Sequence, residues 1–209
     1  MKIAFTTLGC KLNYAETSTY ERGFVAAGWE VVPWSSEADV YLVNTCAVTE
    51  TAEKKSRNYI RRAHKTNPDA RIIVTGCYAE LRREQIEAIE GVWRVFGAKE
   101  KNMILEVVLN SVIPSEVEGS HTTTFGAYST GERTRSFLKV QDGCNNFCAY
   151  CTVPYARGRS RNIPVCECVK MAQEIAAVGV KEVVLTGVNT GDFGRTTGES
   201  FLDLLKALN

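Results

Sequence analysis

Short apolar and β-branched runs alternate with helical patterns through the first 109 residues. The runs at 2–7, 29–33, 39–44, 71–75 and 92–96 have the length and composition of strands. The segments at 14–27, 50–66, 80–89 and 99–109 have the spacing of helices, and Gly28 and Pro68 follow two of them as typical helix-ending residues. Strands that alternate with helices in this way are typical of a parallel, doubly wound α/β sheet. We expect that fold for residues 1–109.

This periodicity stops between residues 110 and 131, where proline, glycine, serine and threonine accumulate. Such a composition predicts a linker. A second unit, residues 132–209, follows with a strand at 136–141, a cysteine-bearing loop to residue 162, a helix at 164–178, a strand at 182–188, a glycine-rich loop and a helix at 199–208. Because two strand–helix units cannot close a barrel, we expect the sequence to be a piece of a longer protein.

The composition is that of a globular protein: of 209 residues, 44% are hydrophobic and 23% are charged, and the formal net charge is +1. It excludes a disordered chain, a fibre and a coiled coil. No apolar run approaches the roughly 20 residues that span a bilayer, and no signal peptide pattern precedes the first strand. We therefore expect a cytoplasmic protein that does not enter a membrane. The eight cysteines are unusual, and a reducing cytosol favours metal binding over disulfides as their role.

Basic residues are concentrated in two stretches although the total charge is almost neutral. Residues 54–71 contain seven Lys or Arg and one acid, and residues 132–161 contain six Lys or Arg and two acids. Such stretches can bind a polyanion such as a nucleic acid, but a basic helix face is commonly only a solvated surface. The charge pattern leaves both interpretations open.

Three cysteines stand close together in the order C-x3-C-x2-C, at Cys144, Cys148 and Cys151. Three thiolates in one loop can hold three corners of a 4Fe–4S cluster and leave the fourth iron open to a substrate or cofactor. Zinc normally requires a fourth Cys or His nearby, and the only histidines, His64 and His121, are remote in sequence. The spacing therefore favours an iron–sulfur cluster.

Three other cysteines, Cys10, Cys46 and Cys77, each stand two or three residues beyond a predicted strand. The carboxyl ends of parallel strands meet at one edge of the sheet, where α/β proteins bind ligands. Scattered buried cysteines are common, but three at one edge predict a second metal site. Cys166 and Cys168 lie two apart on a predicted helix, so their side chains diverge by about 200° and are not expected to share a metal.

The three-cysteine loop, with an aromatic residue before its last cysteine, resembles the radical S-adenosylmethionine (SAM) superfamily. The resemblance implies that the open iron binds SAM, that an electron from the cluster cleaves SAM to a 5′-deoxyadenosyl radical, and that the three cysteines are catalytic. It also implies that Tyr150 lies against the adenine and that Gly187, Val188 and Asn189 form a glycine-rich strand end near the SAM amino group. Arg157 is expected to bind the cofactor too, because a guanidinium suits a carboxylate or phosphate.

A three-cysteine α/β unit followed by such a loop resembles the methylthiotransferase family. The segments LGCKLN, NTCAVT, VTGCYAE, CNNFCAYCTVPYARGRSRN and LTGVNTGDFGR carry the resemblance, which covers the whole chain except the linker. The stretch from Gly187 to Arg195 is most similar to the branch that acts on N6-threonylcarbamoyladenosine in tRNA. The implied fold is a doubly wound α/β domain followed by the first two βα units of a partial (β/α) barrel. Members normally continue into a fuller barrel and a small β-rich RNA-binding domain.

The resemblance implies transfer of a methylthio group to C2 of the modified adenosine beside the anticodon, with two 4Fe–4S clusters and SAM as cofactors. Cys10, Cys46 and Cys77 would hold the auxiliary cluster, which binds or supplies sulfur. The implied partners are the anticodon stem-loop of tRNA, an electron donor and a sulfur source. Two alternatives stay open: the same chemistry on isopentenyladenosine or on a ribosomal protein, and a non-catalytic iron–sulfur or zinc module that binds RNA.

Overall fold

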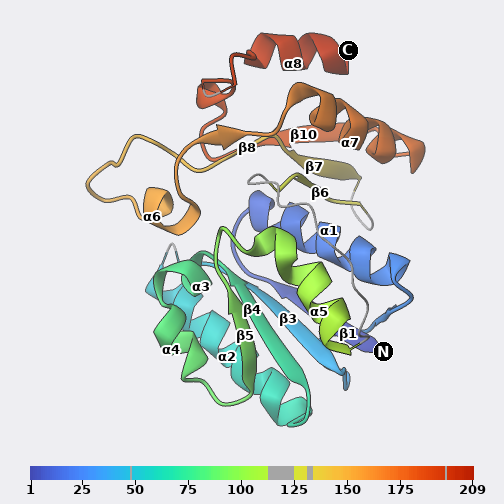
Figure 1. Ribbon diagram of the computed structural model, residues 1–209, viewed down its shortest axis with the longest axis vertical. Helices are drawn as coiled ribbons and strands as arrows, with labels where there is room; N and C mark the ends of the chain where they lie inside the picture. The colour runs from blue at the N-terminus through green and yellow to red at the C-terminus, as the bar shows by residue number, and fades with distance from the viewer. Residues whose placement is uncertain (48, 113–124, 131–133, 196) are drawn as a thin grey trace.

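Five parallel strands form the sheet of the first unit. The computed structural model describes residues 1–47, 49–112, 125–130, 134–195 and 197–209. The strands are β1 (Lys2–Thr7), β2 (Glu30–Val31), β3 (Val40–Thr45), β4 (Arg71–Gly76) and β5 (Val92–Phe96). They lie in the order β2-β1-β3-β4-β5, with the reversal of a doubly wound sheet between β1 and β3. The expected α/β fold class is confirmed (Figure 1).

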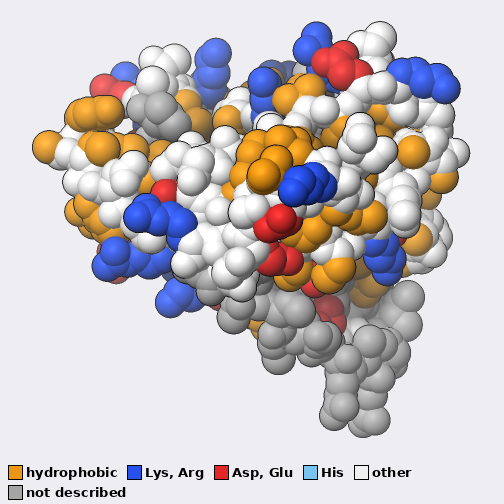
Figure 2. Space-filling view, turned by 90° about the horizontal axis from the view of Figure 1, so that it is seen from above, with side chains coloured by type: hydrophobic (Ala, Val, Ile, Leu, Met, Phe, Trp, Pro, Cys, Tyr) orange, Lys and Arg blue, Asp and Glu red, His pale blue; other side chains and the backbone are white. Residues whose placement is uncertain are grey.

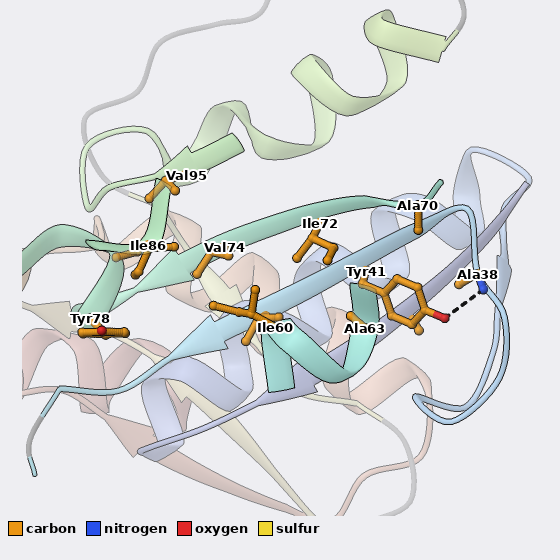
Figure 3. Packing of buried hydrophobic residues seen from close by; sticks show 13 residues of the cluster. Ala38, Tyr41, Ile60, Ala63, Ala70, Ile72, Val74, Tyr78, Ile86 and Val95 are labelled. Atoms are coloured by element: carbon orange, nitrogen blue, oxygen red, sulfur yellow. Dashed lines mark hydrogen bonds between the residues drawn. The ribbon is translucent and has the colours of Figure 1, made fainter. Parts of the chain in front are cut away.

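Helices cover both faces of this sheet. The helices α1 (Lys11–Ala26) and α5 (Ile104–Val112) pack on one face, and α2 (Glu50–Thr66), α3 (Cys77–Leu81) and α4 (Arg83–Glu87) pack on the other (Figure 1). Along β3, Tyr41 and Val43 enter the core on the α2 side, and Val40 and Leu42 enter the other core. Figure 3 shows the α2-side core, where the hydroxyl of Tyr41 accepts a hydrogen bond from the backbone N–H of Ala38. Burial on both faces explains the continuous apolar run in β3.

Two helices of the first unit differ from the sequence prediction. The helix expected at 80–89 is two short helices, α3 and α4, because Arg82 between them leaves the helical conformation with φ −138° and ψ 43°. The helix expected at 99–109 begins as the 3-10 turn η1 (Lys101–Met103), and α5 continues to Val112. Helix α5 therefore enters the segment that was expected to be a linker.

The second unit is built on a sheet of three strands. The strands β7 (Arg135–Lys139) and β10 (Glu182–Thr186) are parallel, α7 (Val165–Ala177) connects them, and α8 (Phe201–Leu208) follows. The cysteine-bearing segment is more ordered than the expected loop. It contains β8 (Gln141–Asp142), α6 (Val153–Arg157) and β9 (Arg161–Asn162), and β8 pairs antiparallel with β9. The 3-10 turn η2 (Thr190–Asp192) lies in the loop after β10.

The expected linker at 110–131 also contains a strand. Residues 113–124 and 131 lie outside the described residues. Within the rest, β6 (Ala127–Tyr128) pairs antiparallel with β7 at the edge of the second sheet. It is ordered because Ala127 is fully buried against Ala15 of α1 and Phe137 of β7. The division into domains 1–109, 110–131 and 132–209 stays a prediction.

Helix α1 lies between the two sheets (Figure 1). Its side toward the second unit is polar as well as apolar. The guanidinium of Arg22 donates to the carbonyl of Tyr128 at 2.9 Å and lies 3.6 Å from the centre of that ring. The hydroxyl of Thr19 donates to the same carbonyl at 3.2 Å. Helix α1 is therefore one of the elements through which the first unit holds the second; α3, which packs against α6, is another.

The outer face of the second unit, beyond its sheet, carries exposed apolar side chains. Figure 2 shows apolar side chains gathered in the middle of the face seen from above, with Lys and Arg spread around them. Leu202 and Leu205 are exposed residues of α8. No helix in the described parts of the chain combines the length and apolarity needed to cross a bilayer.

Candidate functional site

Cys10, Cys46 and Cys77 lie at the carboxyl edge of the five-stranded sheet. Cys10 directly precedes α1, Cys46 follows β3, and Cys77 begins α3 after β4. Because β1, β3 and β4 are neighbours, the three loops leave the same edge side by side, at the reversal point where doubly wound sheets bind ligands. All three cysteines line one cavity of about 780 Å³. The structure brings them together as the sequence predicts, and their binding of a metal stays a prediction.

Two glycines let these loops approach each other. Gly9 has φ +111°, and a Cβ built on it would lie 3.0 Å from the Cβ of Cys46. Gly76 has φ +99°, and a Cβ there would overlap the carbonyl oxygen of Thr45. Residues with a side chain rarely adopt such φ values, whereas glycine adopts them without a steric cost. The tight approach of the cysteine loops therefore depends on both glycines.

Two buried asparagines hold the loops in place. The amide nitrogen of Asn13 donates to the carbonyls of Leu8 and Thr45, both at 2.9 Å. The amide nitrogen of Asn44 donates to the carbonyl of Asn13 at 3.0 Å and to the hydroxyl of Thr17 at 3.1 Å. These bonds tie the start of α1 to the ends of β1 and β3, so the loop that carries Cys10 is fixed from two sides.

Cys144, Cys148 and Cys151 lie in the segment between β8 and α6. Cys144 is buried, Cys148 is exposed and Cys151 is half-buried. The backbone N–H of Cys144 donates to the carbonyl of Gly158 at 3.1 Å, and the N–H of Cys151 donates to the carbonyl of Cys148 at 2.9 Å. None of these three is among the described residues that line the cavity of the N-terminal cysteines, but helix α6, which follows directly, lines it.

The residues near the strand end after β10 and Tyr150, all expected to contact SAM, do not share one environment. Tyr150 is 90% exposed. Gly187 and Val188 line the cavity of the N-terminal cysteines. The backbone N–H of Asn189 donates to the side-chain oxygen of Gln141 at 2.8 Å. The structure thus brings Gly187 and Val188 to the N-terminal cysteines, and it leaves Tyr150 open to a ligand beside the second set.

Gln141 is a positioning residue that the sequence pattern did not single out. Its fully buried amide nitrogen donates to the carbonyls of Asp142 and Gly143 at 3.0 and 2.7 Å and to the hydroxyl of Ser160 at 3.0 Å. A Cβ on Gly187 would lie 2.8 Å from its side-chain oxygen. Gln141 therefore joins the base of the second cysteine loop to the strand end after β10, and it requires a glycine there without any cofactor.

Five charged side chains from five elements form a buried network between the two units. They are Glu16 of α1, Lys101 of η1, Lys139 of β7, Asp142 of β8 and Arg157 of α6, and each is at most 4% exposed. The carboxylate of Glu16 lies 2.7 Å from Nζ of Lys101 and 2.8 Å from Nζ of Lys139. Nη1 of Arg157 lies 3.3 Å from Glu16 and 3.0 Å from Asp142. We call these five residues the interunit network.

The network favours the charged forms of Glu16 and Arg157. Burial by itself would raise the pKa of Glu16, but the three cations of the network lower that pKa well below its ordinary value. Burial would lower the pKa of Arg157, but the carboxylates of Glu16 and Asp142 raise it well above its ordinary value. Opposite charges at short distance in a medium of low dielectric constant explain both directions.

Arg157 therefore belongs neither to a solvated loop nor to an exposed phosphate-binding surface, the two alternatives raised by the sequence. Its side chain is 3% exposed, its Nη2 donates to Oδ1 of Asn13, and Nη2 lies 3.9 Å from Sγ of Cys10. Arg159, two residues later, is exposed and lies over the ring of Phe147. The arginines at 157, 159 and 161 look equivalent in sequence, but only Arg157 belongs to α6 and is buried; Arg161 is half-buried and pairs with Asp142 at 3.1 Å. Its role toward a cofactor stays a prediction.

The chemistry of the N-terminal cysteine set fits an iron–sulfur cluster. Thiolates are the ligands that such clusters use, and a nearby cation favours the thiolate. Burial raises the pKa of the Cys77 thiol, while Arg157 and Lys101 oppose that rise. Among the described residues, no three Cys, His, Asp or Glu side chains converge on one point as a single metal ion requires, whereas a cluster offers each thiolate an iron of its own.

Comparison with known proteins connects both cysteine sets to families. Residues 2–97 match a family described as "Uncharacterized protein family UPF0004", and residues 138–206 match the Radical SAM superfamily. The second unit of the chain therefore contains a radical SAM segment. This segment includes Cys144, Cys148 and Cys151, and the match implies SAM and an iron–sulfur cluster as cofactors.

Curated relatives of this chain are methylthiotransferases, as the sequence motifs predict. The threonylcarbamoyladenosine tRNA methylthiotransferase MtaB of Bacillus subtilis is 41% identical over 99% of this chain and 48% of its own length. The protein of the same name from Aquifex aeolicus is 36% identical over 100% and 53%. The tRNA-2-methylthio-N(6)-dimethylallyladenosine synthase of Alkaliphilus oremlandii is 31% identical over 100% and 47%. The chain spans about half the length of these relatives.

Helix α7 carries the remaining two cysteines of the radical SAM segment. Cys168 is fully buried in the core of the second unit, and Cys166 is exposed. The two side chains thus lie on different sides of the helix, as their spacing predicts. Neither lines the cavity of the N-terminal cysteines within the described part of the chain.

Proposed function

We propose that this chain contains the two cysteine sites of a tRNA methylthiotransferase that adds a methylthio group to C2 of N6-threonylcarbamoyladenosine beside the anticodon. The observation that carries the proposal is the graded similarity to named relatives. Two proteins named for threonylcarbamoyladenosine are 41% and 36% identical to it, and the one named for dimethylallyladenosine is 31% identical. Because the chain spans about half of each relative, the complete activity is proposed for the full-length protein.

In this proposal each of the two cysteine sets holds one cluster with its own role. Cys144, Cys148 and Cys151 hold the cluster that binds SAM, and the N-terminal set holds an auxiliary cluster. When bound, the clusters and SAM supply the electron, the radical and the methylthio group. Support comes from the cavity, whose wall combines all three N-terminal cysteines with residues of α6 and of the strand end after β10. The N-terminal cysteines and the elements on either side of the second cysteine loop therefore face the same cavity.

The exposed basic face of α2 supports tRNA as the substrate. Lys55, Arg61 and Lys65 are exposed on this helix, and α2 lies at the opposite end of the molecule from α8 (Figure 1). Phosphate contacts supply affinity and orientation but do not select a base, so the choice of adenosine falls to the cavity. The other proposed partners are an electron donor and a sulfur source. The proposed site of the reaction is the cytoplasm.

Nucleoside mass spectrometry of tRNA tests the proposed substrate. A strain without the full-length gene should lose the methylthio form of threonylcarbamoyladenosine and accumulate the unmethylthiolated form. The wild-type gene and the control Cys166→Ala should restore it, and Cys10→Ala or Cys148→Ala should not. Loss of the methylthio form of isopentenyladenosine instead would assign the protein to the other tRNA branch. No change in either nucleoside would favour a ribosomal-protein substrate or a non-catalytic module.

Iron analysis tests the proposed number of clusters. The anaerobically reconstituted chain should carry about eight irons, four for each cysteine set. Replacement of all three cysteines of either set by alanine should leave about four. Cys168→Ala, which changes a buried thiol outside both sets, should leave the iron content unchanged. Full iron content in either triple variant would contradict the two-site assignment.

A further inference from the structure

The interunit network carries more positive than negative charge. Its buried cations are Lys101, Lys139 and Arg157, and its buried carboxylates are Glu16 and Asp142. The described residues contribute no third carboxylate within ion-pair distance of these cations. An uncompensated charge is costly to bury, so a negative group is expected where the network meets the cavity.

Arg157 is the member of the network that reaches the N-terminal cysteines. Its Nη1 is occupied by two carboxylates. Its Nη2 donates to Asn13 and lies 3.9 Å from Sγ of Cys10. The same guanidinium lines the cavity together with Cys10, Cys46 and Cys77. The network therefore places one of its cations beside the thiols.

The orientation of Arg157 is fixed from both units. Asn13, which accepts its Nη2 hydrogen bond, is itself held by the carbonyls of Leu8 and Thr45. On the other side, Nη1 of Arg157 lies 3.0 Å from the carboxylate of Asp142. Asp142 belongs to β8, the strand that leads into the second cysteine loop. A guanidinium held in this way presents its charge to the cavity at a constant position.

We propose that Arg157 is a positioning residue of the N-terminal cysteine site, which gives that site a compensating positive charge and raises the reduction potential of a cluster held there. The inference rests on the proposed function, because it requires the N-terminal cysteines to hold an iron–sulfur cluster. Three thiolates bring negative charge, and an added electron increases it, so a fixed cation nearby favours the reduced form. Because Arg157 belongs to the radical SAM segment, the N-terminal site is complete only when both units are packed together.

A redox titration tests this role without any measurement of activity. The full chain with Cys144→Ala/Cys148→Ala/Cys151→Ala isolates the N-terminal cluster, whose midpoint potential is followed by electron paramagnetic resonance. In this background Arg157→Gln should make reduction at least about tenfold less favourable, a shift of about 59 mV to more negative potential for one electron. The matched control Arg159→Gln removes the same charge from an exposed side chain and should leave the potential unchanged.

A charge-conserving variant separates this role from simple structural support. Arg157→Lys keeps the positive charge and loses the fork that bonds Asn13 and the carboxylates, so it should load iron and keep a potential close to that of the parent. If Arg157→Gln has the parent's potential, the proposal is wrong. It is also wrong if Arg157→Lys fails to load iron or has a potential as low as that of Arg157→Gln.

The iron content of the parent protein distinguishes failure of the proposed cluster from failure of the role of Arg157. If the parent with the intact N-terminal set binds no iron, the proposed cluster assignment fails and the role of Arg157 fails with it. If the parent binds iron and only the potential is insensitive to Arg157, the proposed function stands and the role of Arg157 alone is rejected.

Discussion

Replacing Glu16 with glutamine keeps the shape of the side chain and removes its charge from the centre of the interunit network. The carboxylate lies 2.7 Å from Lys101, 2.8 Å from Lys139 and 3.3 Å from Arg157. After Glu16→Gln, Lys101 would lose its carboxylate partner, and Lys139 and Arg157 would keep only the carboxylate of Asp142. The substitution therefore creates uncompensated charge in a place that water does not reach.

The expected cost follows from this imbalance. Removing one partner of a buried ion pair costs about 3–5 kcal/mol, because the other partner is left buried and unpaired. That is a large share of the roughly 5–15 kcal/mol that keeps a typical domain folded. For a chain of this size it corresponds to a fall in Tm of roughly 6–20 °C. The matched control Glu182→Gln removes a carboxylate that is 58% exposed and 3.5 Å from Arg135, and should cost about 0–1 kcal/mol.

Acid should reduce the difference between wild type and Glu16→Gln. The pKa of Glu16 is lowered in the folded protein, while the unfolded chain binds a proton near the ordinary value of about 4.3. The stability that Glu16 contributes is therefore fully present above that pH and is lost as the pH falls toward the lower, folded-state pKa. The glutamine variant lacks this part of the pH dependence, so the two stability curves approach each other below about pH 4.

Urea unfolding followed by tryptophan fluorescence and circular dichroism, at pH 7 and at pH 3, measures both effects. The charge argument is refuted if Glu16→Gln costs no more than Glu182→Gln at pH 7. It is also refuted if the destabilisation does not diminish at pH 3, because packing defects alone have no such dependence on pH.

Three further predictions concern the glycine turn, the helix cysteines and the basic helix. Gly76→Ala should cost at least about 1–3 kcal/mol, because φ +99° is strained for alanine and its Cβ would meet Thr45; iron analysis should show loss from the N-terminal site only. Iodoacetamide at pH 8 should label Cys166 in the folded protein but not Cys168, because burial raises the pKa of the Cys168 thiol to about 12. Mass spectrometry of the peptides measures the labelling, and equal labelling of the two cysteines would contradict the buried position of Cys168. Arg61→Ala should weaken tRNA binding by the full-length protein for all tRNAs alike and reduce the salt slope by roughly one unit; a loss confined to one tRNA would contradict a phosphate contact.

The positions of the N-terminal cysteines could be predicted because they depend on local patterns. The strand β3 is apolar from Val40 to Val43 since both of its faces are covered, so its position, and that of Cys46 just beyond it, can be located from the sequence. The same holds for Cys10 and Cys77 after their strands. Parallel strands bring their carboxyl ends to one edge, so the convergence of the three thiols follows from the class of fold alone.

The strand β6 and the break at Arg82 could not be predicted because neither has a local signal. Ala127 and Tyr128 stand among glycine, serine and threonine, and their strand exists only through pairing with β7 and packing on α1. Arg82 is an ordinary helix-forming residue, and no glycine or proline marks the break between α3 and α4. For β6, contacts with distant parts of the chain determine the local conformation.

The interunit network was missed for a related reason. Glu16 and Arg157 are 141 residues apart, and a single acidic residue in a helix normally indicates a solvent-exposed position. One signal was present, because Lys139 stands between Leu138 and Val140 in a predicted strand that helices should cover. A lysine in such a place needs a buried anion, and this requirement points to a partner without identifying it.

That requirement also explains why the two cysteine sets cannot be understood one unit at a time. Lys139 and Asp142 belong to the strands that lead into the second cysteine loop, while Glu16 lies on the helix that begins directly after Cys10. Separation of the units would leave Glu16 with Lys101 alone, and Arg157 would lose both Glu16 and its contact beside Cys10. The same ion pairs that hold the units together therefore determine the charge around the N-terminal thiols, so packing of the two units and the properties of that site must change together.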